Sequence, residues 1–384
     1  MMGFGVYIHW PYCTRICPYC DFNVYRNRDV RADLWESVLV DDLRWFAAQT
    51  GQRNLSSIYF GGGTPSLMPP ELVGRLVETC AELWSPSDNI EITLEANPTD
   101  AEQARFSDFR KAGINRLSLG IQSFNTNALK FLGRNHSAAE ARAALDLALT
   151  VFDRTTLDLI YARPDQSLKQ WAEELGAALA TGVQHLSLYQ LTVEPDTAFQ
   201  KAVDRQDWAL PADPLQADFY DLTQDTCAAA GKPAYEVSNH AAEGDESRHN
   251  MLYWTHKDYI GIGPGAHGRL SQGSDRLAIS TTLKPADYLT EPPSRKFQTE
   301  TLSSQGQGAE YLLMGLRLQS GIDMDIYEKL SGAPLPEEVI QNLEGENLAH
   351  CTARTLCLTP KGRKLLNRIA VELLTSPEGS GRTG

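Results

Sequence analysis

The sequence has 384 residues, of which 42% are hydrophobic and 22% charged, and its formal net charge at pH 7 is −14. This composition is typical of a folded globular protein with more than one domain. An acidic chain lacks the surplus of lysine and arginine that binding to bulk nucleic acid or to anionic membranes requires. We therefore expect no nucleic-acid partner.

The compartment can be predicted from what the sequence lacks. No run of eighteen apolar residues indicates a transmembrane helix, and the first residues lack the basic and apolar regions of a signal peptide. Seven cysteines, three of them clustered, suit a reduced compartment better than a disulfide framework. We expect a cytoplasmic protein without stable membrane insertion.

Short apolar runs alternate with amphipathic helical runs from residue 3 to about residue 238. The predicted strands span residues 4–9, 57–60, 90–95, 116–120, 156–160, 185–191 and 234–237. The predicted helices span residues 32–48, 70–84, 99–112, 138–152, 168–180 and 215–230. This alternation predicts an α/β fold whose core, residues 1–238, is a partial (β/α) barrel of parallel strands.

The remainder of the chain divides into three segments of different composition and periodicity. Residues 239–297 have weak periodicity and predict a loop-rich extension, which carries His-Asn-x-x-Tyr-Trp and Gly-x-Gly-Pro-Gly-Ala-His-Gly. Residues 298–375 predict a small, mainly helical C-terminal domain of winged-helix type. Its helices are expected at 308–317, 326–331, 337–342 and 361–374, with a short strand at 356–358. Residues 376–384 predict a disordered tail.

Polar residues follow nearly every strand of the predicted barrel. Catalytic residues of such barrels lie at the C-terminal ends of the strands. Here those ends carry His9, residues 61–65, residues 95–98, residues 120–122, Asp158, Gln190 and Glu236. Singly, each has a simpler explanation: Asn97-Pro98 is a turn signal and Asp158 could cap a loop. Together they predict a polar pocket.

The strongest local signal is Cys13, Cys17 and Cys20, spaced Cys-x3-Cys-x2-Cys directly after the first strand. Full protein ligation of a four-iron cluster takes four cysteines, so three leave one iron open to another ligand. The alternative is a zinc site, which would need a fourth ligand such as His9 or Asp21. We favour the cluster.

These cysteines, with Tyr19 before the last of them and Gly61-Gly62-Gly63-Thr64-Pro65 after the second strand, resemble the radical S-adenosylmethionine superfamily. The resemblance implies a [4Fe-4S] cluster whose open iron binds S-adenosyl-L-methionine. It also implies an electron donor for the cluster, whose electron cleaves the C–S bond to give a 5′-deoxyadenosyl radical. We expect the glycine turn to leave its backbone amides free for the methionine part of the cofactor.

Motifs along nearly the whole chain resemble the oxygen-independent coproporphyrinogen III oxidase family. They include the segments beginning at Tyr7, Glu91, Arg116, Leu132, Asp158 and Gly263. By this resemblance the residues that bind S-adenosylmethionine are Tyr7, Tyr19, Gly62, Gly63, Thr64, Glu95, Gln122, Arg134 and Asp158. One departure is Ala162-Arg163-Pro164, where relatives commonly have Gly-Leu-Pro, and the sequence offers no explanation for that charge.

Two branches of the family differ just after the cysteines. The oxidases usually carry a fourth cysteine two residues after the third and a longer N-terminal extension, whereas this chain has Phe22 there and reaches the loop at residue 13. The heme-chaperone branch, HemW, is more similar, above all at His-Asn-x-x-Tyr-Trp. The resemblance implies heme binding by His249, Asn250, Tyr253 and Trp254. The simpler alternative is that these residues are structural.

Which histidine would be the axial heme ligand stays open. Imidazole is a common axial ligand, and Tyr and Trp offer flat apolar faces to a macrocycle. His249 is one candidate, and His9, His240, His256 and His267 are others. His240 stands where relatives commonly have an aromatic residue.

The expected function is therefore that of a heme chaperone, which uses a [4Fe-4S] cluster and S-adenosyl-L-methionine and exchanges heme with donor or acceptor proteins. The alternative is an oxygen-independent coproporphyrinogen III oxidase, which decarboxylates its substrate oxidatively to protoporphyrinogen IX. A third hypothesis is a radical enzyme with an unrelated substrate. No catalytic residue is assigned, and enzymatic activity is left open.

Overall fold

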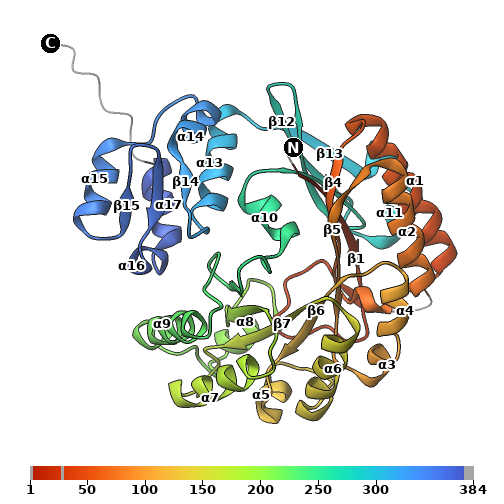
Figure 1. Cartoon of the computed structure of the whole chain (residues 1–384), viewed down its shortest axis with the longest axis horizontal. Helices are drawn as coiled ribbons and strands as arrows, with labels where there is room; N and C mark the ends of the chain where they lie inside the picture. Colours follow the sequence, from red (N-terminus) through yellow and green to blue (C-terminus); the bar gives the residue numbers. More distant parts are fainter. Residues whose placement is uncertain (1–2, 27–29, 376–384) are drawn as a thin grey trace.

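The fold is built on one large curved sheet (Figure 1). The computed structural model describes residues 3–26 and 30–375, so the tail predicted for 376–384 lies outside the described residues. Within this part of the chain the sheet has 11 strands in the order β13-β12-β11-β10-β1-β4-β5-β6-β7-β8-β9. The first strand of the chain thus lies in the interior of the sheet, between β10 and β4.

The strands from β10 to β8 run parallel and form the partial barrel. Their bounds are β1 (Phe4–Trp10), β4 (Asn54–Gly62), β5 (Ser85–Ala96), β6 (Arg116–Gln122), β7 (Arg154–Tyr161), β8 (His185–Gln190) and β10 (Asp258–Ile262). The antiparallel strands are β9 (Asn239–Ala241), β11 (His267–Gln272), β12 (Asp275–Thr281) and β13 (Phe297–Thr301). β1 is buried along almost its whole length, as expected for a parallel strand covered on both faces. The α/β fold class predicted from the sequence is confirmed.

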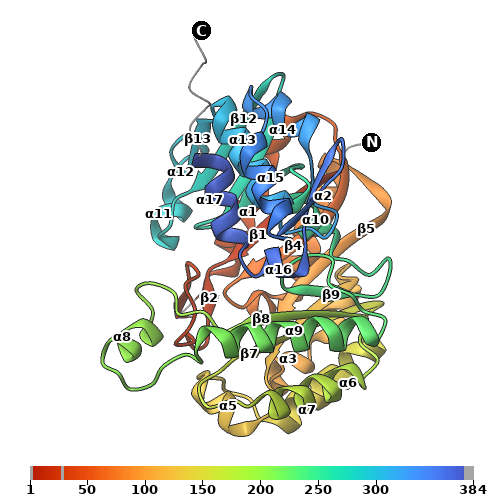
Figure 2. The same ribbon diagram turned by 90° about the vertical axis from the view of Figure 1, so that its left-hand side faces the viewer.

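Helices cover the convex face of the sheet (Figures 1 and 2). They include α1 (Ala32–Thr50), α2 (Pro70–Leu83), α3 (Asp100–Gln103), α4 (Phe106–Lys111), α6 (Ala138–Val151), α7 (Leu168–Leu179) and α9 (Asp213–Ala229). Shorter elements are η1 (Pro65–Leu67), α5 (Thr126–Phe131) and α8 (Ala198–Asp204). Ser137 and Ser167 begin α6 and α7 with complete capping boxes, which satisfy amides that a helix start leaves free.

Three predicted elements differ from the structure, one of which, the helix expected at 361–374, is two helices, Pro360–Arg363 and Leu366–Thr375. The strand expected at 234–237 is wrong: the segment is a bend in which the Glu236 carboxylate accepts hydrogen bonds from the Ser238 amide and the Asn239 side chain, and β9 follows it. The helix expected at 99–112 is split into α3 and α4. At the break Arg105 turns inward and donates hydrogen bonds to the backbone carbonyls of Ser66 (2.5 Å) and Met68.

The segment 239–297 adds regular structure to the sheet and its interior. It supplies β9 to β12, α11 (Pro285–Thr290) and α12 (Pro293–Lys296). It also supplies α10 (Arg248–Trp254), which lies inside the curve of the sheet (Figure 1) and packs on β4 and β1. A buried ion pair between Lys296 and Asp42 (3.0 Å) and a hydrogen bond from Tyr288 to Asp42 (2.6 Å) join α11 and α12 to α1.

The C-terminal region has its own hydrophobic core. Its elements are α13 (Ser304–Gly315), β14 (Ile322–Asp323), α14 (Met324–Ser331), α15 (Glu337–Gly345), β15 (Ala349–Cys351), β16 (Thr355–Leu358), α16 (Pro360–Arg363) and α17 (Leu366–Thr375). Helices around a three-stranded sheet match the predicted small helical, winged-helix-like domain.

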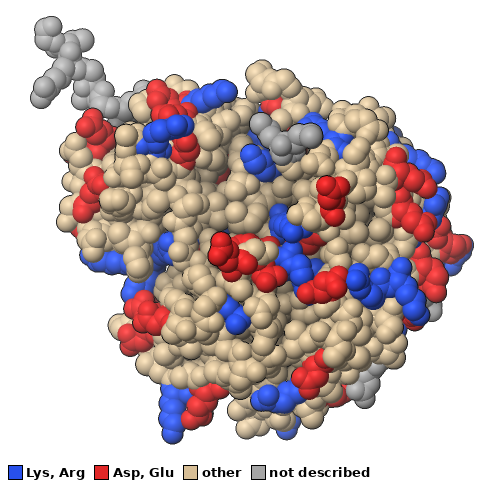
Figure 3. All heavy atoms as spheres, viewed as in Figure 1, with Lys and Arg blue, Asp and Glu red and all other residues tan. Residues whose placement is uncertain are grey.

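Charged side chains connect this domain to the barrel. The ion pairs are Arg317–Glu236 (2.9 Å), Arg269–Glu310 (2.5 Å) and Lys364–Asp221 (2.7 Å). On the face seen in Figure 3, acidic and basic side chains lie beside one another in several groups, between large areas of uncharged residues. Within the described residues, no helix is both long and apolar enough to span a bilayer.

Candidate functional site

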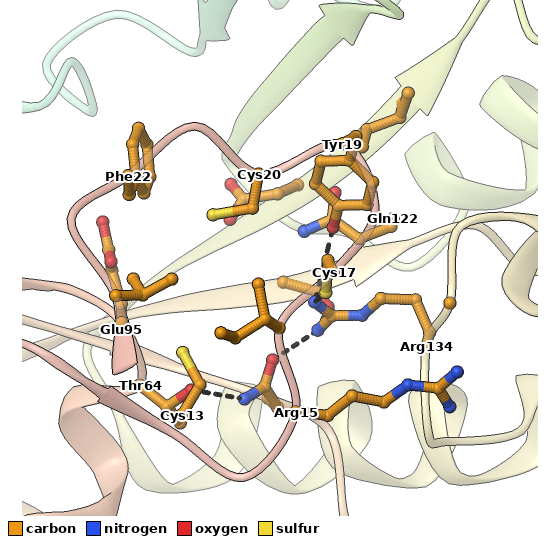
Figure 4. Close-up of a pocket in the computed structure, with 18 of the residues that line it drawn as sticks. Cys13, Arg15, Cys17, Tyr19, Cys20, Phe22, Thr64, Glu95, Gln122 and Arg134 are labelled. Carbon is orange, nitrogen blue, oxygen red and sulfur yellow. Dashed lines mark hydrogen bonds between the residues drawn. The ribbon is translucent and has the colours of Figure 1, made fainter. Parts of the chain in front are cut away.

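A cavity of about 380 Å³ opens at the C-terminal ends of the parallel strands (Figure 4). It brings together Cys13, Cys17, Cys20, Tyr19, Gly62, Gly63, Thr64, Glu95, Gln122, Arg134 and Asp158, all predicted from the sequence. Gln190 also lines it. The strand-end prediction therefore located this cavity correctly, except that His9 and Glu236 do not line it.

Two carboxyl groups form its floor. Glu95 accepts hydrogen bonds from the Tyr59 hydroxyl (2.8 Å) and the Gly62 amide (3.2 Å). Asp158 accepts one from the Ser118 hydroxyl (3.3 Å). Burial raises the pKa of Glu95 to about 7 and that of Asp158 to about 6. Each carboxyl group is therefore poised near neutrality to accept protons or hydrogen bonds from a polar ligand.

Arg134 links the cysteine loop to the strand ends. Its guanidinium donates to the Cys17 sulfur (3.4 Å), the Tyr19 hydroxyl (3.4 Å), the Gly120 carbonyl (2.9 Å) and the Asn97 side chain. Its Nε atom is buried without a hydrogen-bond partner in the described structure. Its hydrogen-bond acceptors are thus a thiol, a hydroxyl, a carbonyl and an amide.

The glycine turn after β4 lies tightly against the cysteine loop. A Cβ atom at Gly62 would stand 2.6 Å from the His9 ring, and one at Gly63 would stand 2.7 Å from the Tyr12 carbonyl oxygen. The expectation that this turn leaves its amides free is wrong. The Gly63 and Thr64 amides donate to the carbonyls of Trp10 (2.7 Å) and Tyr12 (2.9 Å), because the turn continues the pairing of β4 with β1.

The donor set fits a cluster better than a single metal ion. Among the described residues, no group of three or more His, Cys, Asp or Glu side chains is close enough to hold one ion. The three thiols line one cavity but stand apart around it (Figure 4), as ligands of three different irons would. Burial raises the pKa of Cys13, and that of Cys20 to about 11, so iron binding must displace their protons.

A small hydrophobic cluster holds the middle of the cysteine loop. It contains Leu132, Ile160, Leu191 and Phe199, with Tyr19 packed against them. The Phe199 amide also donates to the Pro18 carbonyl (3.0 Å). The segment that carries α8 thus packs on the cysteine loop, and Figure 2 shows α8 on the same side of the molecule as β2 (Tyr12–Cys13).

The other end of the loop is fixed by Asn23. Its side-chain amide donates to the carbonyls of Pro264 (2.9 Å) and Leu283 (2.8 Å). Gly263, with φ of 94°, lets that segment approach, because a Cβ atom there would lie 2.1 Å from the His9 carbonyl oxygen. This explains the glycine-rich motif near residue 263.

Exposed apolar residues line the cavity beside the exposed Arg15 and Asp21. Phe22 is 60% exposed, and Ile16 and Tyr189 are also exposed. An exposed aromatic residue on a loop is not needed for the core, so Phe22 is available for contact with a ligand or partner.

Tyr7 and the residues expected to bind heme do not line the cavity. The Tyr7 hydroxyl lies 3.1 Å from His9 Nδ1. His249 is buried, with Nδ1 2.8 Å from the Ser57 hydroxyl and Nε2 2.6 Å from the Tyr253 hydroxyl. Its ring stacks on Tyr59, with ring centroids 5.0 Å apart. Both nitrogens of His249 are therefore engaged.

The other heme-binding candidates lie on or after α10. The Asn250 amide donates to the Ser247 hydroxyl (3.3 Å), which caps the helix. The guanidinium of Arg317 lies over the Trp254 ring, 4.5 Å from its centroid. Of the alternative ligands, both His9 nitrogens have partners, His240 is fully buried beside Gln224, and His267 is exposed.

The structure also explains Arg163. Its guanidinium donates to Glu174 (2.6 Å) and to the Ile160 carbonyl (2.9 Å). Glu174, on α7, also accepts from the Phe124 amide (2.7 Å), just after Gln122. One buried ion pair thus joins the loops that follow β6 and β7.

Ser118 and Tyr189 line the cavity but were not predicted, and Asn97 was predicted only as part of the strand-end segment 95–98. Asn97 joins Thr64 to Arg134, because its Nδ2 donates to the Thr64 hydroxyl (3.3 Å). Asn97 directly follows β5, a position that indicates a site residue in a barrel of this kind. The same residue begins an Asn-Pro pair, which also indicates an ordinary turn. Ser118 lies inside a strand, and only the pairing of β6 with β7 reveals it.

Known proteins are similar to this chain over nearly its whole length. The sequence model of the Radical SAM superfamily matches residues 7–177, and that of the HemN C-terminal domain matches residues 302–365. The heme chaperone HemW of Bacillus subtilis is 31% identical, with 95% of this chain and 97% of HemW covered. Radical S-adenosyl methionine domain-containing protein 1, mitochondrial, of Danio rerio is 36% identical, with 97% and 87% covered.

A solved structure of coproporphyrinogen III oxidase (HemN) from Escherichia coli, described as a radical SAM enzyme, has the same fold. The TM-score is 0.81 at 21% identity, with 97% of this chain and 90% of that chain covered. The fold and the sequence similarity are those of a radical S-adenosylmethionine protein. Within that superfamily the chain belongs to the oxygen-independent coproporphyrinogen III oxidase family, which includes the heme chaperone HemW.

Proposed function

We propose that this protein is a heme chaperone, which binds heme and delivers it to heme-requiring proteins. Its relatives of that name cover nearly the whole chain. The observation that carries the proposal is Phe22, exposed on the cavity rim where the oxidase branch usually has a cysteine. A phenyl ring can neither ligate iron nor exchange a proton, but it can pack on a flat apolar ligand.

The cavity floor supports the cofactors of the proposal. Cys13, Cys17 and Cys20 would hold a [4Fe-4S] cluster, and Glu95 and Asp158 would accept hydrogen bonds from S-adenosyl-L-methionine. The reduced cluster supplies the electron for cleavage of that cofactor. The protein's own contribution is to hold both cofactors through Gln122 and Arg134 and to exclude water from the strand ends. A cytoplasmic location, and an electron donor and heme-exchanging proteins as partners, belong to the same proposal.

The test compares two activities of one anaerobically reconstituted preparation. In the first arm hemin is titrated and the Soret band is followed, and the loaded protein is then mixed with a heme-free b-type cytochrome. In the second arm coproporphyrinogen III and S-adenosylmethionine are supplied, and protoporphyrinogen IX is measured. We expect saturable heme binding, transfer to the cytochrome and no decarboxylation.

The contrary result is decarboxylation that disappears in Cys17→Ser, which would assign the oxidase function instead. Absence of saturable heme binding would also reject the proposal. The Phe22→Cys variant serves as a matched control, because it restores the cysteine of the oxidase branch without changing the three cluster ligands.

A further inference from the structure

Arg134 is a partly buried cation that has no carboxylate partner. Its hydrogen bonds go to the Cys17 sulfur (3.4 Å), the Tyr19 hydroxyl (3.4 Å), the Gly120 carbonyl (2.9 Å) and the Asn97 side chain, and no ion pair joins it to another residue of the described chain. Enclosing a charge without a counter-charge costs stability. The missing negative charge arises on the cysteine loop when its thiols lose their protons to bind iron.

The backbone holds Arg134 tightly against the cysteine loop. Gly133 follows α5 in the left-handed conformation, with φ of 68°, and the Arg134 amide donates to the Leu129 carbonyl (2.8 Å). A Cβ atom at Gly133 would stand 2.6 Å from the Pro18 ring. The guanidinium therefore reaches Cys17 from a turn that the helix end and the cysteine loop hold in place.

The side chain of Asn97 has one possible orientation between Arg134 and Thr64. A guanidinium can only donate, so the Asn97 oxygen must face Arg134, and Asn97 Nδ2 donates to the Thr64 hydroxyl (3.3 Å). The backbone amide of Asn97 is held in turn by the Glu102 carboxylate (2.7 Å). Dashed lines in Figure 4 follow this chain from Arg134 to Thr64. The direction of donation along the chain is thus fixed by chemistry.

Thr64 continues the chain to Cys13. Because the Thr64 oxygen accepts from Asn97, its proton stays available to a second acceptor. Burial raises the pKa of the Cys13 thiol, and a hydrogen bond from the Thr64 side chain opposes that rise. One guanidinium thus acts on two cluster cysteines, on Cys17 directly and on Cys13 through Asn97 and Thr64.

Such a chain has a definite effect on an iron–sulfur cluster. Reduction adds one electron, and so one negative charge, to the cluster, and hydrogen bonds to its sulfurs help to set the reduction potential. Donors that point at the sulfurs stabilise the more negative form. Hydrogen bonds in series also polarise one another, so the far end of the chain feels the guanidinium charge.

We propose that Asn97 is a positioning residue that raises the reduction potential of the [4Fe-4S] cluster, by holding the Arg134 guanidinium at Cys17 and the Thr64 hydroxyl at Cys13. The electron comes from the electron donor, and Asn97 exchanges neither a proton nor a covalent bond. The alternative is that Arg134 serves only to pair with the carboxylate of S-adenosyl-L-methionine, in which case the chain is purely structural. The proposal rests on the cluster of the proposed function and adds the residues that tune it.

The test is a redox titration of anaerobically reconstituted full-length protein without S-adenosylmethionine, in which electron paramagnetic resonance measures the reduced cluster at set potentials. Thr64→Val keeps the shape of the side chain but removes its hydroxyl. We expect it to shift the reduction equilibrium about tenfold toward the oxidised cluster, which is about 59 mV for one electron. Asn97→Leu should shift it at least as far, because it also releases Arg134. Thr64→Ser should restore the wild-type potential.

Asn135→Leu is the matched control, because Asn135 is an exposed amide beside Arg134 and the same change there should not alter the potential. If Asn97→Leu failed to keep its cluster, the comparison of Thr64→Val with Thr64→Ser would decide alone.

Wild-type potentials in Thr64→Val and Asn97→Leu would overturn the inference, while the cluster and the chaperone function would stand. A shift that arose only after S-adenosylmethionine was added would also overturn it, in favour of the alternative. If the wild type itself took up no cluster, the proposed function would fail as well.

Discussion

At the scale of single residues, Arg163 shows how a departure from the family pattern is compensated. Relatives commonly have Gly-Leu-Pro where this chain has Ala162-Arg163-Pro164. Ala162 has φ of 55°, a conformation that favours glycine, and Arg163 is anchored to Glu174 beneath the loop. The ion pair therefore holds a loop that has lost its glycine.

We expect Arg163→Leu to lower the free energy of unfolding by about 3 kcal/mol, because it leaves the buried Glu174 carboxylate without its cation. Adding Glu174→Gln should recover a large part of this loss. Urea denaturation of the two single variants and the double variant measures the coupling. If the double variant were no more stable than Arg163→Leu, the ion pair would not be the cause.

Glu95 predicts a pH effect on stability. Burial raises its pKa from the usual 4.5 to about 7, so the folded state holds this proton more tightly than the unfolded chain. Stability from this group is present below about pH 4.5 and is lost as the pH rises to about 7. Glu95→Gln should therefore exceed the wild type in stability at pH 8 by roughly 2 to 3 kcal/mol. Urea denaturation at pH 5 and pH 8 checks this, and equal differences at both values would contradict it.

At the scale of elements, α8 illustrates a segment whose importance is not visible in the sequence. Phe199 of α8 packs against the rings of Phe131 and Trp208, and Tyr19 of the cysteine loop packs against the same cluster. The segment therefore stabilises the loop locally and leaves the main core unaffected.

Phe199→Ala removes the centre of this cluster, at a cost of roughly 3 kcal/mol. Because the cluster is separate from the main core, we expect faster amide hydrogen exchange in residues 14–20 and 192–204 and unchanged exchange in β4 and β5. Mass spectrometry of the protein without iron provides the measurement. Leu147→Ala, at an exposed position of α6, is the control. Uniform acceleration over the whole chain would show that α8 is part of the main core.

The barrel helices and the parallel strands other than β10 could be predicted. Their hydrophobic residues recur with a clear period, and each element ends at a polar residue or a glycine. β10 to β13 could not. β10 pairs with β1, which is distant in sequence, and β11 and β12 form a hairpin in a segment whose hydrophobic periodicity is weak. The same distinction holds for the site. The cysteines and strand-end residues were predicted locally, whereas the hydrogen bonds of the Gly63 and Thr64 amides depend on strand pairing.

At the scale of the whole molecule, the barrel and the C-terminal domain each have a hydrophobic core. The ion pairs Arg317–Glu236, Arg269–Glu310 and Lys364–Asp221 form a polar junction between the two. The ion pairs of that junction are partly exposed, so dissolved salt can screen them. The stability of the C-terminal domain should thus be coupled to that of the barrel more strongly at low salt.

We expect one calorimetric unfolding transition at about 0.1 M NaCl and two separated transitions at about 1 M, where the Debye length falls from about 10 Å to about 3 Å. Arg317→Ala should show two transitions already at the lower concentration. The opposite finding, a single transition of the same shape in every condition, would mean that the two cores unfold as one unit.

The position of β1 has a consequence for biosynthesis. The strand leaves the ribosome long before its neighbour β10, which begins at Asp258, and the loop after β1 is anchored by Asn23 to the carbonyl of Leu283. The nascent cysteine loop therefore stays without its final support until most of the chain has been translated. Because domains generally fold as units during synthesis, the iron–sulfur cluster proposed for this loop should assemble only after the barrel has been translated.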